Sequence, residues 1–181
     1  IILKGMLKKL YKKIGILGGT FDPPHVGHLY ISKVALKKFK LNKVIWVVTK
    51  KNPLKKKPYL SIETRVKLSK KITIKEKKIT VQYLDDKTKS NNTYNLLNYL
   101  KEKNKRSKIY FLMGADNLLK FHKWNKWKLI PKLAKMVVFA RNNYSFKNLS
   151  TAVAKNIDKS DWMYVKSKKV NISSSLIKKF W

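Results

Sequence analysis

The 181-residue chain contains no cysteine, which excludes disulfide bridges, thiolate zinc ligands and a cysteine nucleophile. A chain without disulfides suits a reducing compartment, so we expect a cytoplasmic protein. Its apolar runs are short, like residues 44–49, whereas a membrane-spanning helix needs about 20 apolar residues. Residues 1–14 also lack the apolar core of a secretory signal. The sequence therefore predicts a soluble protein without a membrane partner, built as a single domain over 1–181 with residues 1–12 as a disordered or non-native extension.

Acidic residues are scarce, with 9 against 44 basic residues and a net charge of +35. Such a charge attracts phosphorylated ligands and nucleic acids. Only Arg65, Arg106 and Arg141 are arginines, however, and the reading of base edges depends heavily on arginine. Because the lysines are spread along the whole chain, the pattern favours a solvated lysine-rich surface over a specific nucleic-acid site, which stays open as an alternative. The sequence indicates no oligomeric state.

Short runs rich in β-branched residues alternate with longer amphipathic stretches. This alternation is typical of βα units that build a parallel sheet. We therefore predict an α/β protein with a Rossmann-like, doubly wound parallel sheet, whose ligands bind beyond the carboxyl ends of the first, second and fourth strands. The predicted strands are residues 14–17, 44–49, 79–83, 109–113, 136–140 and 163–165, and the predicted helices are residues 25–39, 61–71, 93–103 and 173–180.

Helix starts are marked by typical residues. Pro23 and Pro24 suit a first helical turn, and Ser61, Asn91-Asn92 and Ser173 are good cap residues.

The most informative segment is GGTFDPPHVGH, residues 18–28, which joins the first predicted strand to the first helix. Gly18 and Gly19 allow close approach to a ligand, and the helix N-terminus offers amide groups to a phosphate. His25 and His28 are three residues apart and therefore share one helix face. Phosphate contact, a structural role and metal binding are all compatible with this spacing, although the chain has only one further histidine and few carboxylates for a metal.

Neither a Walker A sequence nor G-x-G-x-x-G occurs in the chain. Residues 18–28 instead resemble the G-x-F-D-x-x-H-x-G-H signature of the HxGH nucleotidylyltransferase superfamily. Residues 172–178, ISSSLIK, resemble its second motif, I-S-S-T-x-I-R, which grips the nucleotide triphosphate. Two departures occur there, because Ser175 replaces threonine and keeps the hydroxyl, whereas Lys178 replaces arginine and loses its bidentate fork.

Within the superfamily the chain is most similar to the bacterial nicotinate-nucleotide adenylyltransferase family, over about residues 14–178. Residues 52–55, 61–65 and 93–97 fall where that family has related motifs, and residues 114–127 resemble its G-A-D-N and W-x-x-W region. Trp124 and Trp127 alone are typical of a helix packed on a core. After Gly114-Ala115-Asp116 at a strand end, we expect Trp124 to stack on a pyridine ring and Asp116 to accept ribose hydroxyl groups.

The resemblance implies transfer of AMP from ATP to nicotinate mononucleotide, with deamido-NAD and pyrophosphate as products and Mg²⁺ held mainly by the substrate phosphates. Asp22 is either an outer helper of this site or a cap of the following helix. The alternatives are the same chemistry on nicotinamide mononucleotide, or a nucleic-acid-binding protein on a degenerate version of the fold. The implied catalytic residues are His25, His28 and Lys178; the implied ATP and phosphate ligands are Gly18, Gly19, Thr20, Phe21, Ser173, Ser174 and Ser175; the implied nicotinate-nucleotide ligands are Lys55, Thr93, Asp116 and Trp124.

Overall fold

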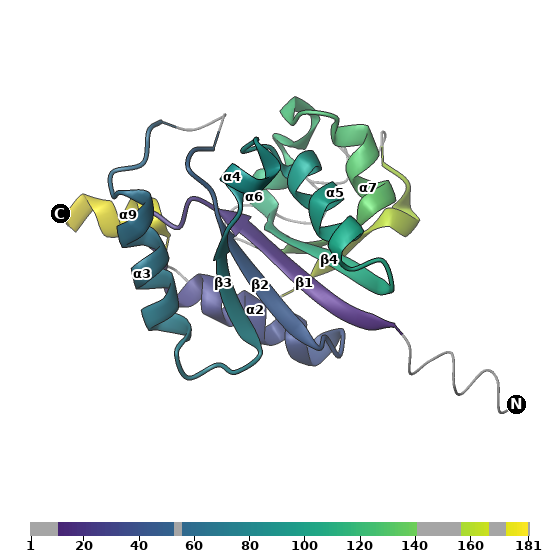
Figure 1. Ribbon diagram of the computed structural model, residues 1–181, viewed down its shortest axis with the longest axis horizontal. Helices are drawn as coiled ribbons and strands as arrows, with labels where there is room; N and C mark the ends of the chain where they lie inside the picture. The colour runs from purple at the N-terminus through teal and green to yellow at the C-terminus, as the bar shows by residue number, and fades with distance from the viewer. Residues whose placement is uncertain (1–10, 53–55, 141–156, 167–172, 181) are drawn as a thin grey trace, which may run out of the picture.

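The computed structural model describes residues 11–52, 56–140, 157–166 and 173–180. Their centre is a six-stranded sheet of order β3-β2-β1-β4-β5-β6 in which every neighbouring pair is parallel (Figure 1). The predicted fold class is confirmed, and each predicted strand lies within two residues of its observed ends. The strands are β1 (Lys12–Gly19), β2 (Lys43–Val48), β3 (Ile79–Tyr83), β4 (Ser107–Gly114), β5 (Lys135–Phe139) and β6 (Trp162–Val165). Lys12 therefore belongs to β1, whereas residues 1–10 lie outside the described part.

The strand order reverses between β1 and β4. From β1 the chain moves outward through β2 to β3, then returns to β4 on the other side of β1 and continues to β5 and β6. Leu17 pairs with Leu112 in this central register. The loops that follow β1 and β4 consequently diverge to opposite faces of the sheet, and the crevice between them is the usual ligand site of such folds.

Helices cover both faces of the sheet, which explains why its strands are almost continuously apolar. One buried cluster contains Ala35 and packs against residues of α2 and α3, while the other contains Leu97 and Leu100 of α5 together with residues of α6 and α7. The helices are α2 (Val26–Lys38), α3 (Ile62–Thr73), α4 (Asp85–Thr88), α5 (Thr93–Lys103), α6 (Ala115–Leu118), α7 (Ile130–Leu133) and α9 (Ser174–Ile177), with 3₁₀ turns at Phe121–Lys123, Trp127–Leu129, Lys159–Asp161 and Lys178–Phe180.

Three of the predicted caps are confirmed by hydrogen bonds. The side chains of Ser61, Asn92 and Ser173 accept from the backbone amides of residues 64, 95 and 176, respectively. The prolines, by contrast, do not lie in the first turn of α2, which begins after them at Val26. The helices α4, α6 and α7 were not predicted, because four residues are too few to display a helical period.

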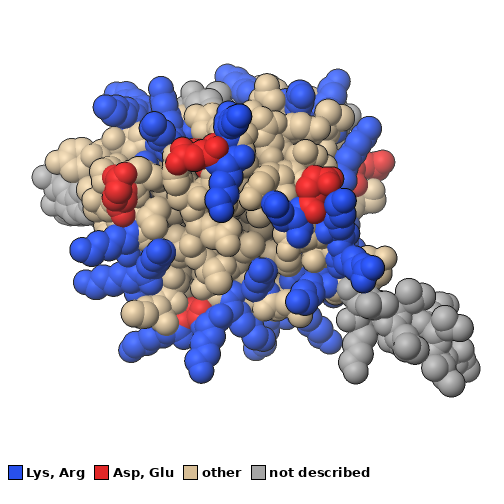
Figure 2. All heavy atoms as spheres, viewed as in Figure 1, with Lys and Arg blue, Asp and Glu red and all other residues tan. Residues whose placement is uncertain are grey.

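Lysines are spread over the visible face of the molecule rather than gathered in one stripe (Figure 2). Figure 2 shows basic side chains distributed over the whole visible face, with a few acidic side chains among them. In the described part of the chain, no helix is long and apolar enough to span a bilayer.

Candidate functional site

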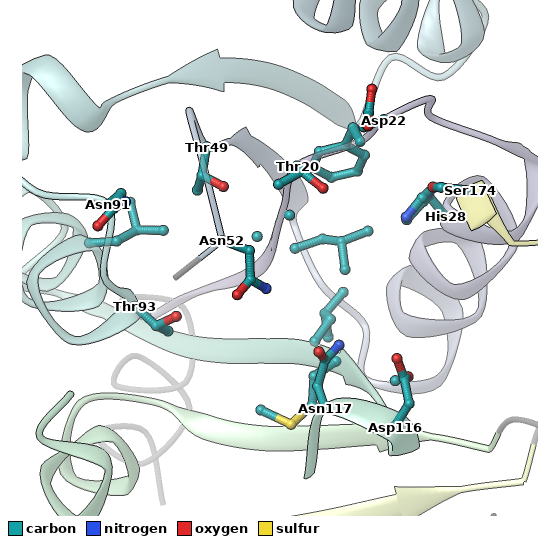
Figure 3. A pocket seen from close by; sticks show the side chains of 18 of the residues that line it. Thr20, Asp22, His28, Thr49, Asn52, Asn91, Thr93, Asp116, Asn117 and Ser174 are labelled. Atoms are coloured by element: carbon teal, nitrogen blue, oxygen red, sulfur yellow. The ribbon is translucent and has the colours of Figure 1, made fainter. Parts of the chain in front are cut away.

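A cavity of about 540 Å³ opens at the carboxyl ends of the central strands. The segments that follow β1, β2 and β4 contribute to its walls, as predicted, together with the start of α5 and the C-terminal segment (Figure 3). Lys55, a predicted nicotinate-nucleotide ligand, lies outside the described residues. The other predicted site residues line this cavity: Gly18, Gly19, Thr20, Phe21, His25, His28, Thr93, Asp116, Trp124, Ser173, Ser174, Ser175 and Lys178.

The two histidines of the first motif form the start of α2. His25 is its N-cap and accepts the Gly27 amide on Nδ1 at 3.1 Å, while the His25 amide donates to Nδ1 of His28 at 3.2 Å. The ring centroids are only 3.8 Å apart. Since Nδ1 of each ring accepts a hydrogen bond, each neutral imidazole carries its proton on Nε2. Both side chains therefore combine a structural role with a donor atom suited to a phosphate oxygen.

The aromatic rings of Phe21 and Trp46 pack against His28. The Phe21 ring lies 4.9 Å from Trp46 in a stacked geometry and 4.8 Å from His28. Trp46 donates to Ser32 Oγ, which in turn donates to the His28 carbonyl, both at 2.8 Å. Phe21 has φ 48°, a backbone conformation that bulky residues rarely adopt, and its ring is 2% exposed. The buried stack explains how this conformation is maintained next to the site.

Asp22 links three segments of the site. Its side chain accepts the amides of Tyr59 and Leu60, each at 2.9 Å, and forms an ion pair with Lys178 at 3.0 Å. The carboxylate side chain is only 4% exposed. The interpretation of Asp22 as the cap of α2 is wrong, because His25 occupies that position. Asp22 instead joins the first motif to the start of α3 and to the C-terminal segment.

The pKa of the Asp22 carboxyl is shifted below its ordinary value of 3.8. Burial raises this pKa, but the amides of Leu60 and Tyr59 and the ammonium group of Lys178 together outweigh burial. A depressed pKa means that the charged form stabilises the folded state at pH values above 3.8, and that this stabilisation is lost as the pH falls through the folded-state pKa.

We expect Asp22→Asn to be less stable than wild type at neutral pH, because the amide removes the charge that pairs with Lys178. The difference in unfolding free energy between the two proteins should shrink as the pH is lowered below the ordinary Asp22 value of 3.8. Urea unfolding at a series of pH values measures this difference. A difference that stays constant into the acidic range would contradict the assignment of the charge.

The C-terminal motif packs directly against the first motif. Ser174 Oγ donates to the Pro23 carbonyl at 2.8 Å, and Lys178 reaches Asp22 across 156 sequence positions. Ser173 caps α9, so its hydroxyl serves the helix as well as the cavity wall. Two predicted phosphate segments from opposite ends of the chain are thereby brought to one side of the cavity, where Figure 3 places His28 beside Ser174.

Thr93, Asp116 and Trp124 also line the cavity, and Figure 3 shows Thr93 across the view from His28 and Ser174. Trp124 is half-buried and packs against Phe121 and Phe111, with ring centroids at 5.3 and 6.0 Å. Trp124 follows a 3₁₀ turn and has an extended backbone, so the prediction that it lies on an amphipathic helix is wrong. The prediction that its ring packs on the core is confirmed. Trp124 therefore combines core packing with a position on the cavity wall.

Several polar residues that line the cavity were not predicted as site residues. Those after β2 and β4 lie in segments predicted to form the site but were not chosen individually, whereas those after β3 follow a strand end that was not predicted to contribute. Arg65 was not predicted as a site residue either, although its side chain donates to the backbone carbonyls of Thr20, Thr49 and Lys50. The unpredicted lining residues include Thr49, Asn52, Asp85, Asn91, Asn92 and Asn117.

Comparisons with known proteins agree with this geometry. The chain matches the family described as "Cytidylyltransferase-like" over residues 16–180. It is 48% identical to the "Probable nicotinate-nucleotide adenylyltransferase" of Pelagibacter ubique, with 92% of each chain covered, and 35% identical to the protein of the same name from Aliarcobacter butzleri, covering 92% of this chain and 86% of the relative. A Plasmodium falciparum nicotinic acid mononucleotide adenylyltransferase complexed with NaAD has the same fold, with a TM-score of 0.76, 21% identity and coverage of 94% of this chain and 84% of that chain.

Proposed function

The chain belongs to the nicotinate-nucleotide adenylyltransferase family, and from this membership we propose that it transfers the adenylyl group of ATP to nicotinate mononucleotide. The products are nicotinate adenine dinucleotide (deamido-NAD) and pyrophosphate. We place the reaction in the cytoplasm, since a chain without cysteine suits a reducing compartment.

The observation that carries this proposal is the meeting of two anion-binding segments at one side of the cavity. The start of α2 supplies His25 and His28, and the C-terminal segment supplies hydroxyl groups and Lys178. Helix amides, imidazole donors, hydroxyls and an ammonium group are all suited to a polyphosphate. The cavity wall also contains Asp116 and Trp124, which offer a carboxylate and an aromatic ring for a second nucleotide.

The reaction requires alignment more than acid–base chemistry. A phosphate oxygen of the mononucleotide attacks the α-phosphorus of ATP, a new P–O–P bond forms, and the bond to the bridging α–β oxygen breaks so that pyrophosphate leaves with its electron pair. The attacking phosphate is already an anion at neutral pH, so no base is needed to generate it. His25, His28 and Lys178 stabilise the charge that develops on the α-phosphate and on the leaving group.

We propose that Mg²⁺ is carried mainly by the substrate phosphates and water. Within the described ranges of the chain, no group of three or more histidine, aspartate or glutamate residues could hold a metal ion. This donor set suits an ion that keeps most of its waters and is bound through polyphosphate oxygens. When bound, Mg²⁺ neutralises phosphate charge, and the protein groups then orient the complex.

Trp124 is assigned to the acceptor side. We expect Trp124→Ala to raise KM for nicotinate mononucleotide about fivefold, because an aromatic stacking surface contributes about 1 kcal/mol, with a smaller effect on KM for ATP. Steady-state kinetics with each substrate varied in turn measures this difference. Trp127→Ala, which also removes an indole that packs on Phe121, is the control for loss of core packing. Equal rises of both KM values in Trp124→Ala would instead indicate a purely structural role.

A pyrophosphate-release assay tests the proposed function. Purified protein is incubated with Mg²⁺ and ATP, together with either nicotinate mononucleotide or nicotinamide mononucleotide. We expect clear preference for the acid. Preference for the amide would overturn the assigned acceptor, and absence of turnover with both would overturn the proposed activity.

A further inference from the structure

We propose that Arg65 is a positioning residue that fixes two walls of the cavity relative to one another. The first wall is the phosphate loop, residues 18–22, and the second is the post-β2 segment, residues 49–52. The inference deepens the proposed function and rests on it, because both walls line the cavity to which the adenylyl transfer is assigned.

Arg65 connects these walls through their backbone. Its Nη1 donates to the Thr20 carbonyl at 2.6 Å and to the Thr49 carbonyl at 2.7 Å, and Nη2 donates to the Lys50 carbonyl at 3.1 Å. Its Nε donates to the Leu60 carbonyl, also at 3.1 Å. One side chain of α3 thus binds the phosphate loop, the post-β2 segment and the turn that leads into its own helix.

The side chain is buried and acts from outside the cavity. Arg65 is 2% exposed and does not belong to the residues that line the cavity, whereas Thr20, Thr49 and Asn52 do. It therefore has no direct route to a substrate in this arrangement. Its influence passes through the positions of the backbone segments that it holds.

The choice of arginine at this position is informative. Of the 44 basic residues only three are arginines, so lysine serves at nearly every other basic position. The guanidinium group is planar and presents five N–H donors in a fixed fork, whereas an ammonium group on a flexible stem cannot satisfy four separated carbonyls in the same way. Arg106 is exposed and lies before β4, at the opposite end of the sheet from the cavity.

Other contacts hold the same backbone, so Arg65 completes a network. The Thr49 amide donates to the Gly19 carbonyl at 2.9 Å, which bonds the two walls directly. The Lys50 amide donates to Asp85 Oδ2 at 2.7 Å, and Asn91 Nδ2 donates to the Lys51 carbonyl at 3.3 Å. The post-β2 segment is thus bound to α4 and to the residues that follow α4, while Arg65 binds it to the phosphate loop.

This arrangement implies a role in alignment. The phosphate loop begins the wall that contacts ATP, and Asn52 projects toward the centre of the cavity in Figure 3. A shift between these walls would change the distance between the attacking oxygen and the α-phosphorus. Misplacement by about 1 Å is enough to lower a rate about 100-fold.

The test compares Arg65→Lys and Arg65→Gln with wild type, using Arg106→Lys as the matched control. We expect both Arg65 variants, assayed at a low temperature where circular dichroism shows them folded, to have kcat lowered about 10- to 100-fold while each KM changes by less than about threefold. Arg106→Lys should behave as wild type. Hydrogen exchange of peptides covering residues 18–22 and 49–52 should be faster in the Arg65 variants alone.

Two results would overturn the positioning role. One is a folded Arg65→Lys protein whose kcat and loop exchange both match wild type. The other is failure of both variants to fold at any temperature, which would assign Arg65 to stability alone. The exchange measurement needs no turnover, so it remains decisive if wild type shows no activity with nicotinate mononucleotide, a result that would contradict the proposed function instead.

Discussion

Replacing His28 with asparagine is expected to lower kcat about 100-fold or more, with a loss of stability limited to the ring contacts of the imidazole with Phe21 and His25. Asparagine can place Oδ1 where His28 Nδ1 accepts the His25 amide, so the cap of α2 is retained. It has no atom at the position of Nε2, so the donor to the phosphate is lost. Steady-state kinetics and urea unfolding of the same preparation measure the two effects separately.

A second substitution at the same position, His28→Gln, tests the role of the Nε2 donor directly. Glutamine carries an amide donor that can lie near the position of Nε2, and at this helix position its Oε1 can also accept the His25 amide. It should therefore retain more activity than His28→Asn, and the cap of α2 should be retained as well. His122→Asn, at an exposed histidine outside the cavity, is the control. A folded His28→Asn protein with wild-type kcat would contradict the role assigned to Nε2.

Replacing Lys178 with methionine is expected to lower kcat/KM for ATP about 10- to 100-fold. The estimate follows from a hydrogen bond to a charged group, which contributes about 1.5–3 kcal/mol, with each 1.4 kcal/mol corresponding to a factor of ten. The same change leaves the buried Asp22 carboxylate without its 3.0 Å ammonium partner. We therefore expect a loss of stability as well, measured by urea unfolding beside the ATP dependence of the rate.

The neighbouring lysine provides a matched control for this prediction. Lys179→Met removes the same charge from the same 3₁₀ turn, but Lys179 is exposed and does not line the cavity. It should leave the unfolding free energy unchanged to within about 1 kcal/mol and kcat/KM within about twofold of wild type, because single surface charges contribute little. Equal losses in the two variants would show that net charge, rather than the position of Lys178, determines the affinity for ATP.

The sequence predicted the sheet because its signals are local. Short β-branched runs between amphipathic stretches located all six strands, and the caps at Ser61, Asn92 and Ser173 marked three helix starts. The two motifs around His28 and Ser174 were also visible, since a glycine pair and clustered hydroxyls are local features. Parallel strands place their carboxyl ends at one edge, which is why separate motifs could be assigned to one site.

The parts of the site that were missed depend on distant backbone groups. Asp22 was considered as a helix cap, but its partners are amides 37 and 38 residues away, and amides are common to every residue except proline. Arg65 binds four carbonyl groups, which likewise leave no mark in the sequence. The place of residues 61–65 among the family-related motifs and the rarity of arginine in a lysine-rich chain marked this position, but neither indicated the backbone groups that Arg65 binds.

The fate of the ATP phosphates tests the proposed adenylyl transfer most directly. The protein is incubated with Mg²⁺, nicotinate mononucleotide and ATP radiolabelled either on the α-phosphate or on the γ-phosphate, and the products are separated by chromatography. Adenylyl transfer places the α-label in nicotinate adenine dinucleotide and the γ-label in pyrophosphate. An α-label that remains in ATP, or that leaves as ADP or free AMP, would contradict adenylyl transfer by this cavity.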